Sequence, residues 1–198
     1  MSEMVDAIKQ AVEQGMPALE PDEDLPPTLL THNPEGMSLA QFGITLETVS
    51  DRDELADLLT ATMVVDRADA AAFVMLAWAV TLSEAPDDEF DFATHPDRRE
   101  MATIAHITRD GDAFYVAPVQ RRKGDHPLLG EWEEYPADGI DGRMHAAMRR
   151  GLLLVSNMPE HIDKALESMG PEESADLVMA FLSIERQRAA AQQAATRN

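Results

Sequence analysis

The chain contains no cysteine, so disulfide bonds, thiolate catalysis and cysteine-bound zinc or iron–sulfur clusters are excluded. No apolar run approaches the roughly 20 residues that a helix needs to cross a bilayer. The first residues, MSEMVDAIKQ, carry acids where a signal peptide would carry bases. Together these absences predict a soluble cytoplasmic protein that does not enter a membrane.

Several catalytic and cofactor motifs are missing as well. The sequence has neither the GxxxxGKS/T phosphate loop nor GxGxxG. The stretch GMSLA at 36–40 begins like a nucleophile elbow but lacks the second glycine. The six histidines are scattered, without HExxH or HxH spacing. We therefore predict no metal site and no cofactor.

Basic residues are scarce, with 16 lysines and arginines against 37 acids and a net charge of −21. Such a field disfavours direct binding to nucleic acid backbones and to anionic membrane surfaces, which both need clustered bases. The favoured interpretation of the acid excess is solubility, for instance in a salty cytoplasm. The less favoured interpretation is a surface for a basic protein partner, with imitation of DNA as one version.

The 44% of hydrophobic residues supply a packed core. The predicted strands and helices together indicate an α+β fold. We divide the chain into an N-terminal helix with an arm rich in proline and acid (1–28), a single α+β domain (29–185) and a helical tail (186–198). The first helix docks either on the body or on another subunit. The tail lacks large apolar side chains, so it either frays or docks on a partner.

The predicted sheet is antiparallel with three to five strands, packed with helices. The strands are expected at 70–82, 100–109, 112–120 and 151–156, and the helices at 3–14, 51–63, 143–150, 160–168 and 171–190. Ser50 is the expected N-cap of the second helix. Residues 31–38 are interpreted as a turn-rich connection and 42–49 as a short strand.

Residues 70–120 carry the strongest local pattern. Ala70–Leu82 is apolar on both faces, which favours a central strand covered on both sides, although its alanines also suit a buried helix. Asp110-Gly111 suits the centre of a two-residue type I′ turn. That turn pairs Ile107 with Phe114 and His106 with Tyr115. Trp78 is expected in the core.

Within this region, Trp78, the acid-rich gap, the HPDRRE stretch at 95–100 and the Asp110-Gly111 turn resemble a group of prokaryotic and phage proteins without an established activity. The resemblance covers about 70–119. It implies a strand–loop–hairpin core and assigns no catalytic residue.

Two places hold candidate site residues. His95, Asp97 and Arg98 surround Pro96 and offer an imidazole, a carboxylate and an anion-binding cation, but a charged loop at the entrance of a strand is the favoured interpretation. The long loop at 121–142 opens with three bases and carries Trp132 and Tyr135. These two aromatics either form an interface or fold back to anchor the loop.

These observations favour an acidic protein-interaction or oligomerising module without intrinsic catalysis. It would engage a protein partner, or a second copy of itself, through the arm, the 121–142 loop or the tail. The alternative is a small enzyme of unknown reaction with a polar site near His95, Asp97 and Arg98.

Overall fold

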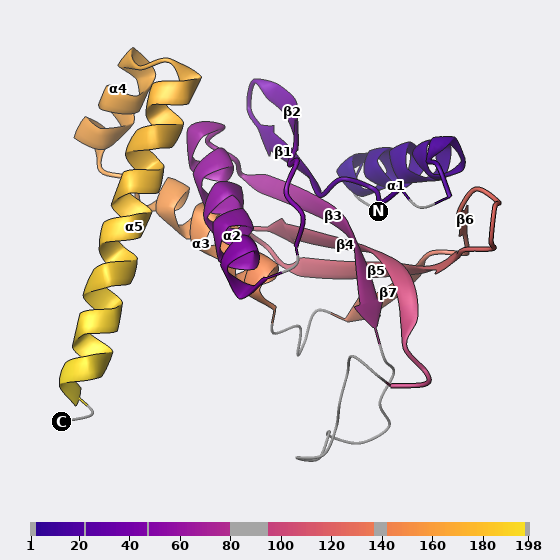
Figure 1. Cartoon of the computed structure of the whole chain (residues 1–198). Helices are drawn as coiled ribbons and strands as arrows, with labels where there is room; N and C mark the ends of the chain where they lie inside the picture. The colour runs from indigo at the N-terminus through magenta and orange to yellow at the C-terminus, as the bar shows by residue number, and fades with distance from the viewer. Residues whose placement is uncertain (1–2, 22, 47, 80–94, 137–141, 197–198) are drawn as a thin grey trace.

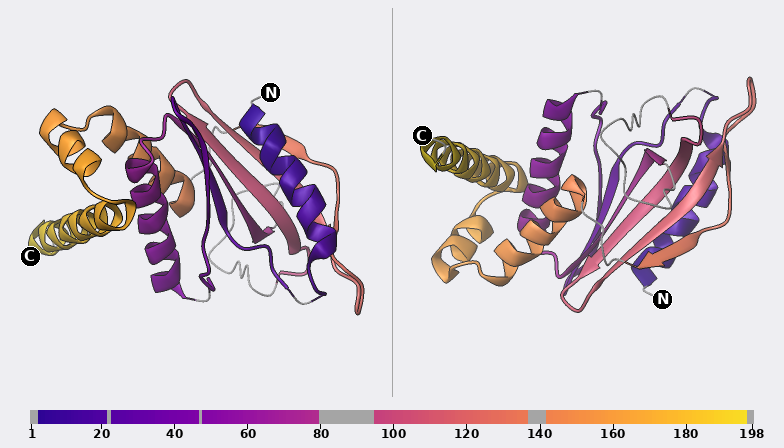
Figure 2. Two further views of the ribbon diagram at one scale, coloured as in Figure 1. Left: turned by 90° about the horizontal axis from the view of Figure 1, so that it is seen from above. Right: turned by 90° about the horizontal axis from the view of Figure 1, so that it is seen from below.

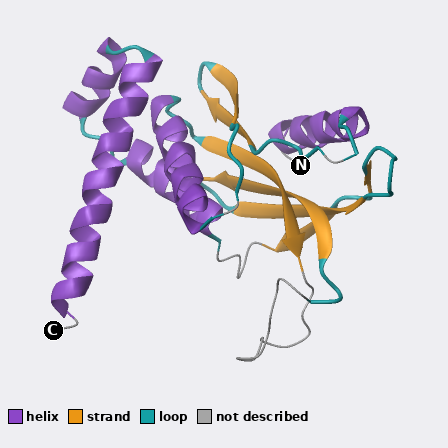
Figure 3. Ribbon diagram, viewed as in Figure 1, coloured by secondary structure: helices purple, strands orange, loops and turns teal. Residues whose placement is uncertain are grey.

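The computed structural model describes residues 3–21, 23–46, 48–79, 95–136 and 142–196. The protein is α+β, as predicted, and Figures 1 and 3 show its strands gathered into one curled sheet between helices. The elements in chain order are α1 (Glu3–Gly15), the 3-10 turn η1 (Met16–Ala18), β1 (Thr28–Asn33), β2 (Gly36–Gln41), α2 (Val49–Val65), β3 (Ala70–Ala79), β4 (Arg99–Thr108), β5 (Asp112–Gln120), β6 (Leu128–Leu129), β7 (Glu133–Pro136), α3 (Arg143–Ser156), α4 (Glu160–Ser168) and α5 (Pro171–Thr196).

The sheet is antiparallel and has seven strands among the described residues, more than the three to five that we predicted. Its order is β2-β1-β3-β4-β5-β6, and β7 also pairs with β5. The additional strands are the β1–β2 hairpin and two short strands, β6 and β7, inside the predicted 121–142 loop. Residues 80–82, the predicted end of β3, lie outside the described part of the chain, as do residues 137–141 of the loop.

Helices cover both faces of the sheet (Figure 2). A further pair, α4 and α5, lies on the outer side of α2 and α3. On one face α1 docks on the chain's own sheet, where Ile8 and Val12 pack with Val74 and Ile104. On the other face α2 and α3 bury Leu59 and Met148 against Phe73 and Ile107. Val178 and Leu182 of α5 join Leu166 of α4 and Val64 of α2 in a third cluster. The first half of β3 is therefore central and covered on both faces, as predicted, whereas residues 75–79 are only partly covered.

The segment expected as a turn-rich connection, 31–38, forms the β1–β2 hairpin instead. Asn33 pairs with Gly36 around Pro34-Glu35, and Oδ1 of Asn33 accepts hydrogen bonds from the N–H groups of Glu35 and Gly36. Gly36 adopts φ 144°, a conformation that favours glycine. The strand expected at 42–49 is not found, since residues 42–46 are irregular and α2 begins at Val49.

The β4–β5 hairpin exists, but its turn is shifted. Ile107 pairs with Asp112 and Ile104 with Tyr115, two positions away from the predicted register. The hydroxyl of Thr108 donates to the Gly111 carbonyl and accepts from the N–H groups of Asp110 and Gly111. No positive φ occurs in this turn, so it is not type I′. A shift of two residues preserves which side chains share a face.

Two helix predictions also need correction. Residues 151–156 are not a strand, because α3 continues through them to Ser156. Its inward positions Met148 and Leu152 are four residues apart and share the core with α2. The N-cap of α2 is Thr48 rather than Ser50, since Thr48 and Asp51 form a reciprocal capping box.

The C-terminal helix is longer than the predicted 171–190. It runs from Pro171 to Thr196, so residues 186–196 of the predicted tail are helical. Figure 1 shows α5 extending along α2 with its C-terminal end directed away from the sheet. No helix of the described residues is long and apolar enough to span a membrane.

Candidate functional site

An open cavity of about 1170 Å³ lies at one end of the sheet. Five segments line it, and four arginines are among their residues. Among the described residues, the segments are Pro21 and residues 24–27 of the arm, the stretch 42–46, the end of β3 at 76–78, residues 98–100 at the start of β4, and residues 118–122 at and just after the end of β5. The cavity thus combines the predicted arm with the first residues of the predicted loop.

Of the predicted catalytic candidates, only Arg98 lines this cavity. His95 lies in a turn, where its Nδ1 accepts a hydrogen bond from the N–H of Asp97 at 3.1 Å and its carbonyl accepts one from the N–H of Arg98 at 3.1 Å. Asp97 itself is exposed. The structure therefore does not bring His95 and Asp97 into the cavity with Arg98, and the hexapeptide shapes the entrance to β4.

Trp78 does not lie in the core as predicted. Half of its surface is exposed, and the guanidinium of Arg98 lies 4.0 Å from the centre of its ring. This distance is typical of a cation–π contact. The end of β3 therefore presents an aromatic face and a fixed positive charge to the cavity.

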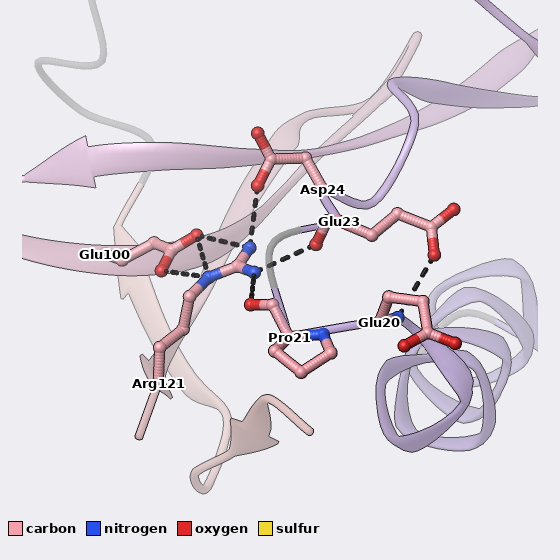
Figure 4. A network of polar contacts seen from close by, with 6 residues as sticks. All are labelled: Glu20, Pro21, Glu23, Asp24, Glu100 and Arg121. Carbon is pink, nitrogen blue, oxygen red and sulfur yellow. Dashed lines mark hydrogen bonds and ion pairs between the residues drawn. The ribbon is translucent and has the colours of Figure 1, made fainter. Parts of the chain in front are cut away.

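Arg121 organises one wall of the cavity (Figure 4). Its guanidinium donates to both carboxylate oxygens of Glu100 and to Oδ1 of Asp24 at 2.7 Å. It also donates to the carbonyl oxygens of Pro21 and Glu23, each at 2.9 Å. The five donors of a guanidinium suit such a set of acceptors. Arg121 thereby fastens the proline-rich arm to the start of β4.

The two aromatics of the 121–142 loop have different surroundings. Trp132 packs beside the cluster under α1, and Nζ of Lys9 lies 5.9 Å from its ring centre. Tyr135 is 44% exposed, and its hydroxyl donates to Oε2 of Glu133 at 3.1 Å. This hydrogen bond to a carboxylate raises the pKa of Tyr135, helped by the negative charge of Glu133. Trp132 therefore anchors the loop, and Tyr135 remains at the surface.

A second polar cluster escaped the sequence analysis. Oδ2 of Asp112 accepts hydrogen bonds from Nε2 of His145 at 2.7 Å and from Nε of Arg149 at 2.8 Å. Arg149 also donates to the Thr108 carbonyl at 3.0 Å. None of these residues lines the cavity at the sheet end. The cluster joins α3 to the β4–β5 turn. No sequence motif predicts it, because Asp112 lies 33 residues before His145 and 37 residues before Arg149 in the chain.

His106 is a buried histidine of β4, on the face covered by α1. Its side chain is 8% exposed, and its Nε2 has no hydrogen-bond partner among the described residues. It lies opposite Ala113 rather than Tyr115. Burial lowers the pKa of His106, and the negative charge of Asp112 opposes this effect. Burial thus favours the neutral form of the ring.

Within the described ranges, no group of three or more His, Asp or Glu side chains is arranged to hold a metal ion. No family model, curated protein or solved structure matches the chain. The likeness of residues 70–119 to prokaryotic and phage proteins accordingly stays a prediction.

Proposed function

We propose that this protein is an interaction module without intrinsic catalysis and that it associates with a second copy of itself through α5. The observation that carries this proposal is a row of exposed apolar side chains on that helix. Leu177, Phe181 and Ile184 are 43%, 47% and 49% exposed. Their spacing of four and three residues places them along one face of a helix.

This face is separate from the one that fixes α5 to the body. Val178 and Leu182 make the contact with α2 and α4 and are almost completely buried. At about 100° per residue, the centre of the exposed row lies roughly 110° from the centre of that buried pair. α5 thus presents a second apolar face to solvent, which is the usual property of a helix that packs on a partner.

The charges along α5 favour an antiparallel copy as the partner. Glu173 precedes Phe181 by eight residues and Arg188 follows it by seven, and both charged residues are exposed. These offsets correspond to about 12 Å and 10 Å along the helix. A two-fold axis through Phe181 would therefore bring Glu173 of each copy close to Arg188 of the other. The same arrangement stacks the apolar row of one copy on that of the other.

A binding role is also supported by the arrangement of the alternative enzyme site. His95 and Asp97 are engaged in a local turn and do not converge with Arg98 on the cavity.

The net charge of −21 per chain makes two copies repel one another, and salt screens this repulsion. We therefore expect the association to strengthen as ionic strength rises.

Static light scattering on the full chain at 50 mM and 500 mM NaCl tests the proposal. We expect a mass near twice 21.8 kDa at the higher salt concentration. Phe181→Glu is expected to give the mass of one chain under both conditions. Gln187→Glu adds the same charge outside the apolar row and serves as the matched control.

A charge exchange sharpens this test. Arg188→Glu should weaken the dimer at least several-fold, and Glu173→Arg combined with Arg188→Glu should restore it. A wild-type chain that stays monomeric at 500 mM NaCl and about 100 µM protein would contradict the proposal. So would a Phe181→Glu variant that dimerises like the wild type.

A further inference from the structure

Part of β3 has no strand on one side among the residues that the structure describes. The ladder between β1 and β3 ends where Thr28 pairs with Val74, whereas β3 continues for five more residues, 75–79. Pro26 and Pro27 precede Thr28 and lack the N–H group that a ladder needs. Within the described ranges, no other strand pairs with this side of residues 75–79.

The cavity at the sheet end lies along this unpaired edge. Leu76, Ala77 and Trp78 are consecutive residues, and all of them line it. Successive side chains of a strand point to opposite faces, so a cavity that touches all three reaches the edge itself. Residues from both faces of the sheet line the cavity. Leu25 packs with the cluster under α1, and Ile44 packs with the cluster under α2 and α3.

The charge of the lining is opposite to that of the chain. The described residues that line the cavity include four arginines and two acids, and Arg121 is bound to both of those acids, Glu100 and Asp24. Arg98 lies over the ring of Trp78. Arg99 and Arg122 are exposed, and no ion pair of either side chain is found among the described residues. Among the described residues, the lining is thus positively charged in a chain with 37 acids, and it adjoins the part of β3 that no described strand pairs.

We propose that this cavity binds an extended acidic segment of a partner protein, which adds antiparallel to residues 75–79 of β3. Strand addition supplies main-chain hydrogen bonds to the unpaired edge, and side-chain pockets supply specificity. Acidic side chains of the segment pair with Arg99 and Arg122, since guanidinium groups bind carboxylates in a bidentate fashion. Apolar side chains of the segment lie on the opposite face, against Leu25 and Leu76, which both pack with the cluster under α1. The site extends the interaction role proposed above and lies on a different surface from α5.

Fluorescence of Trp78 provides the measurement. The full chain with Trp132→Phe retains Trp78 as its only tryptophan. The probe is a library of acetylated, amidated pentapeptides, Glu-X-Glu-X-Glu, in which X is Val, Ile, Leu or Phe. We expect a saturable change in Trp78 fluorescence. Arg99→Gln combined with Arg122→Gln should weaken binding at least tenfold, while Arg109→Gln, an exposed arginine outside the cavity, should leave it unchanged.

Two further libraries separate strand addition from charge attraction. A proline at the central position removes a backbone donor and should weaken binding about tenfold. Lysine in place of glutamate should abolish binding.

The proposal is wrong if the glutamate library gives no saturable change up to 1 mM, or if the proline or lysine libraries bind equally well. It is also wrong if dodecanoate binds with the same dependence on Arg99 and Arg122 while the peptides do not, because the cavity would then hold a small amphiphile. The dimer mass is read separately by light scattering, so failure here and failure of self-association are distinguishable.

Discussion

Arg121 and Glu100 form a two-point ion pair in which Nε donates to Oε2 at 2.9 Å and Nη2 donates to Oε1 at 3.0 Å. The Glu100 side chain is 12% exposed and that of Arg121 is 23% exposed. Removing the arginine leaves a poorly solvated carboxylate without its donor. Arg121→Met should therefore lower the free energy of unfolding by about 2 kcal/mol, as measured by urea denaturation.

Arg122→Met is the matched control for this loss, since Arg122 is exposed and should change stability by less than about 0.5 kcal/mol. The double variant Glu100→Met with Arg121→Met should recover part of the stability that Arg121→Met loses. Equal stabilities of the Arg121 and Arg122 variants would contradict the importance of the pair.

Two hydroxyl residues lie at the start of α2, and only Thr48, not Ser50, caps the helix. The N–H of Asp51 donates to Oγ1 of Thr48 at 3.2 Å, and the N–H of Thr48 donates to the Asp51 carboxylate at 2.7 Å. Thr48→Ala should lower the free energy of unfolding by about 1 kcal/mol. Ser50→Ala, within the first turn, should have little effect. The reverse order of these two effects in thermal or urea unfolding would contradict the assigned cap.

Gly151 marks a close approach between α3 and α2. A Cβ atom added at this residue would lie 2.9 Å from Cβ of Met63. Alanine raises helix propensity by about 1 kcal/mol, but overpacking a core costs about 1–3 kcal/mol, so Gly151→Ala should be destabilising by about 1 kcal/mol overall. Gly15→Ala is the control, because Gly15 is helical and has no neighbour within 4 Å of the added atom. Stabilisation of both variants would show that the helices separate easily.

Burial of His106 makes stability depend on pH. Its pKa in the folded protein lies below its ordinary value of 6.5, so the unfolded chain binds more protons at mildly acid pH. Stability should be complete above about pH 6.5 and should fall as pH decreases below that value. Urea denaturation at pH 7.5 and 5.5 should show a smaller loss for His106→Leu than for the wild type, whereas His161→Gln, at an exposed site, should behave like the wild type. Identical losses in all three proteins would remove His106 as the cause.

The strands could be predicted where their apolar patterns and lengths were clear. The register between two strands could not, because it depends on hydrogen bonds within the turn. The strands at 70–79 and on both sides of Asp110-Gly111 follow from their apolar patterns. The hydroxyl of Thr108 organises the turn locally, and this interaction is invisible to a rule based on Asp-Gly dipeptides. The predicted register was wrong by two residues, yet the same side chains share a face as predicted, because two is the period of a strand.

The error at residues 151–156 has a different origin. The run Leu152–Val155 is short and apolar, and such runs do not distinguish strand from buried helix. Continuing the four-residue spacing from Met144 through Met148 to Leu152 would have predicted the helix. The β1–β2 hairpin was missed because Pro34 and Gly36 were interpreted as signs of a longer connection rather than of a tight turn.

The cavity was beyond sequence analysis, because it draws its lining from five separate segments. The basic pairs Arg98-Arg99 and Arg121-Arg122 were visible, but their convergence depends on the antiparallel pairing of β4 with β5. Of the predicted catalytic residues, only Arg98 lines the cavity. A cluster of charges adjacent in sequence therefore identified one residue of the cavity but not the others.

The fastening of the arm by Arg121 has a consequence for synthesis on the ribosome. Its contacts with Pro21, Glu23 and Asp24 span 100, 98 and 97 residues of sequence. At elongation rates of about 5–20 residues per second, the arm emerges roughly 5–20 s before its arginine exists. During that interval the amphipathic first helix is outside the ribosome without the sheet that will cover it, so its apolar face is open to chaperones and proteases.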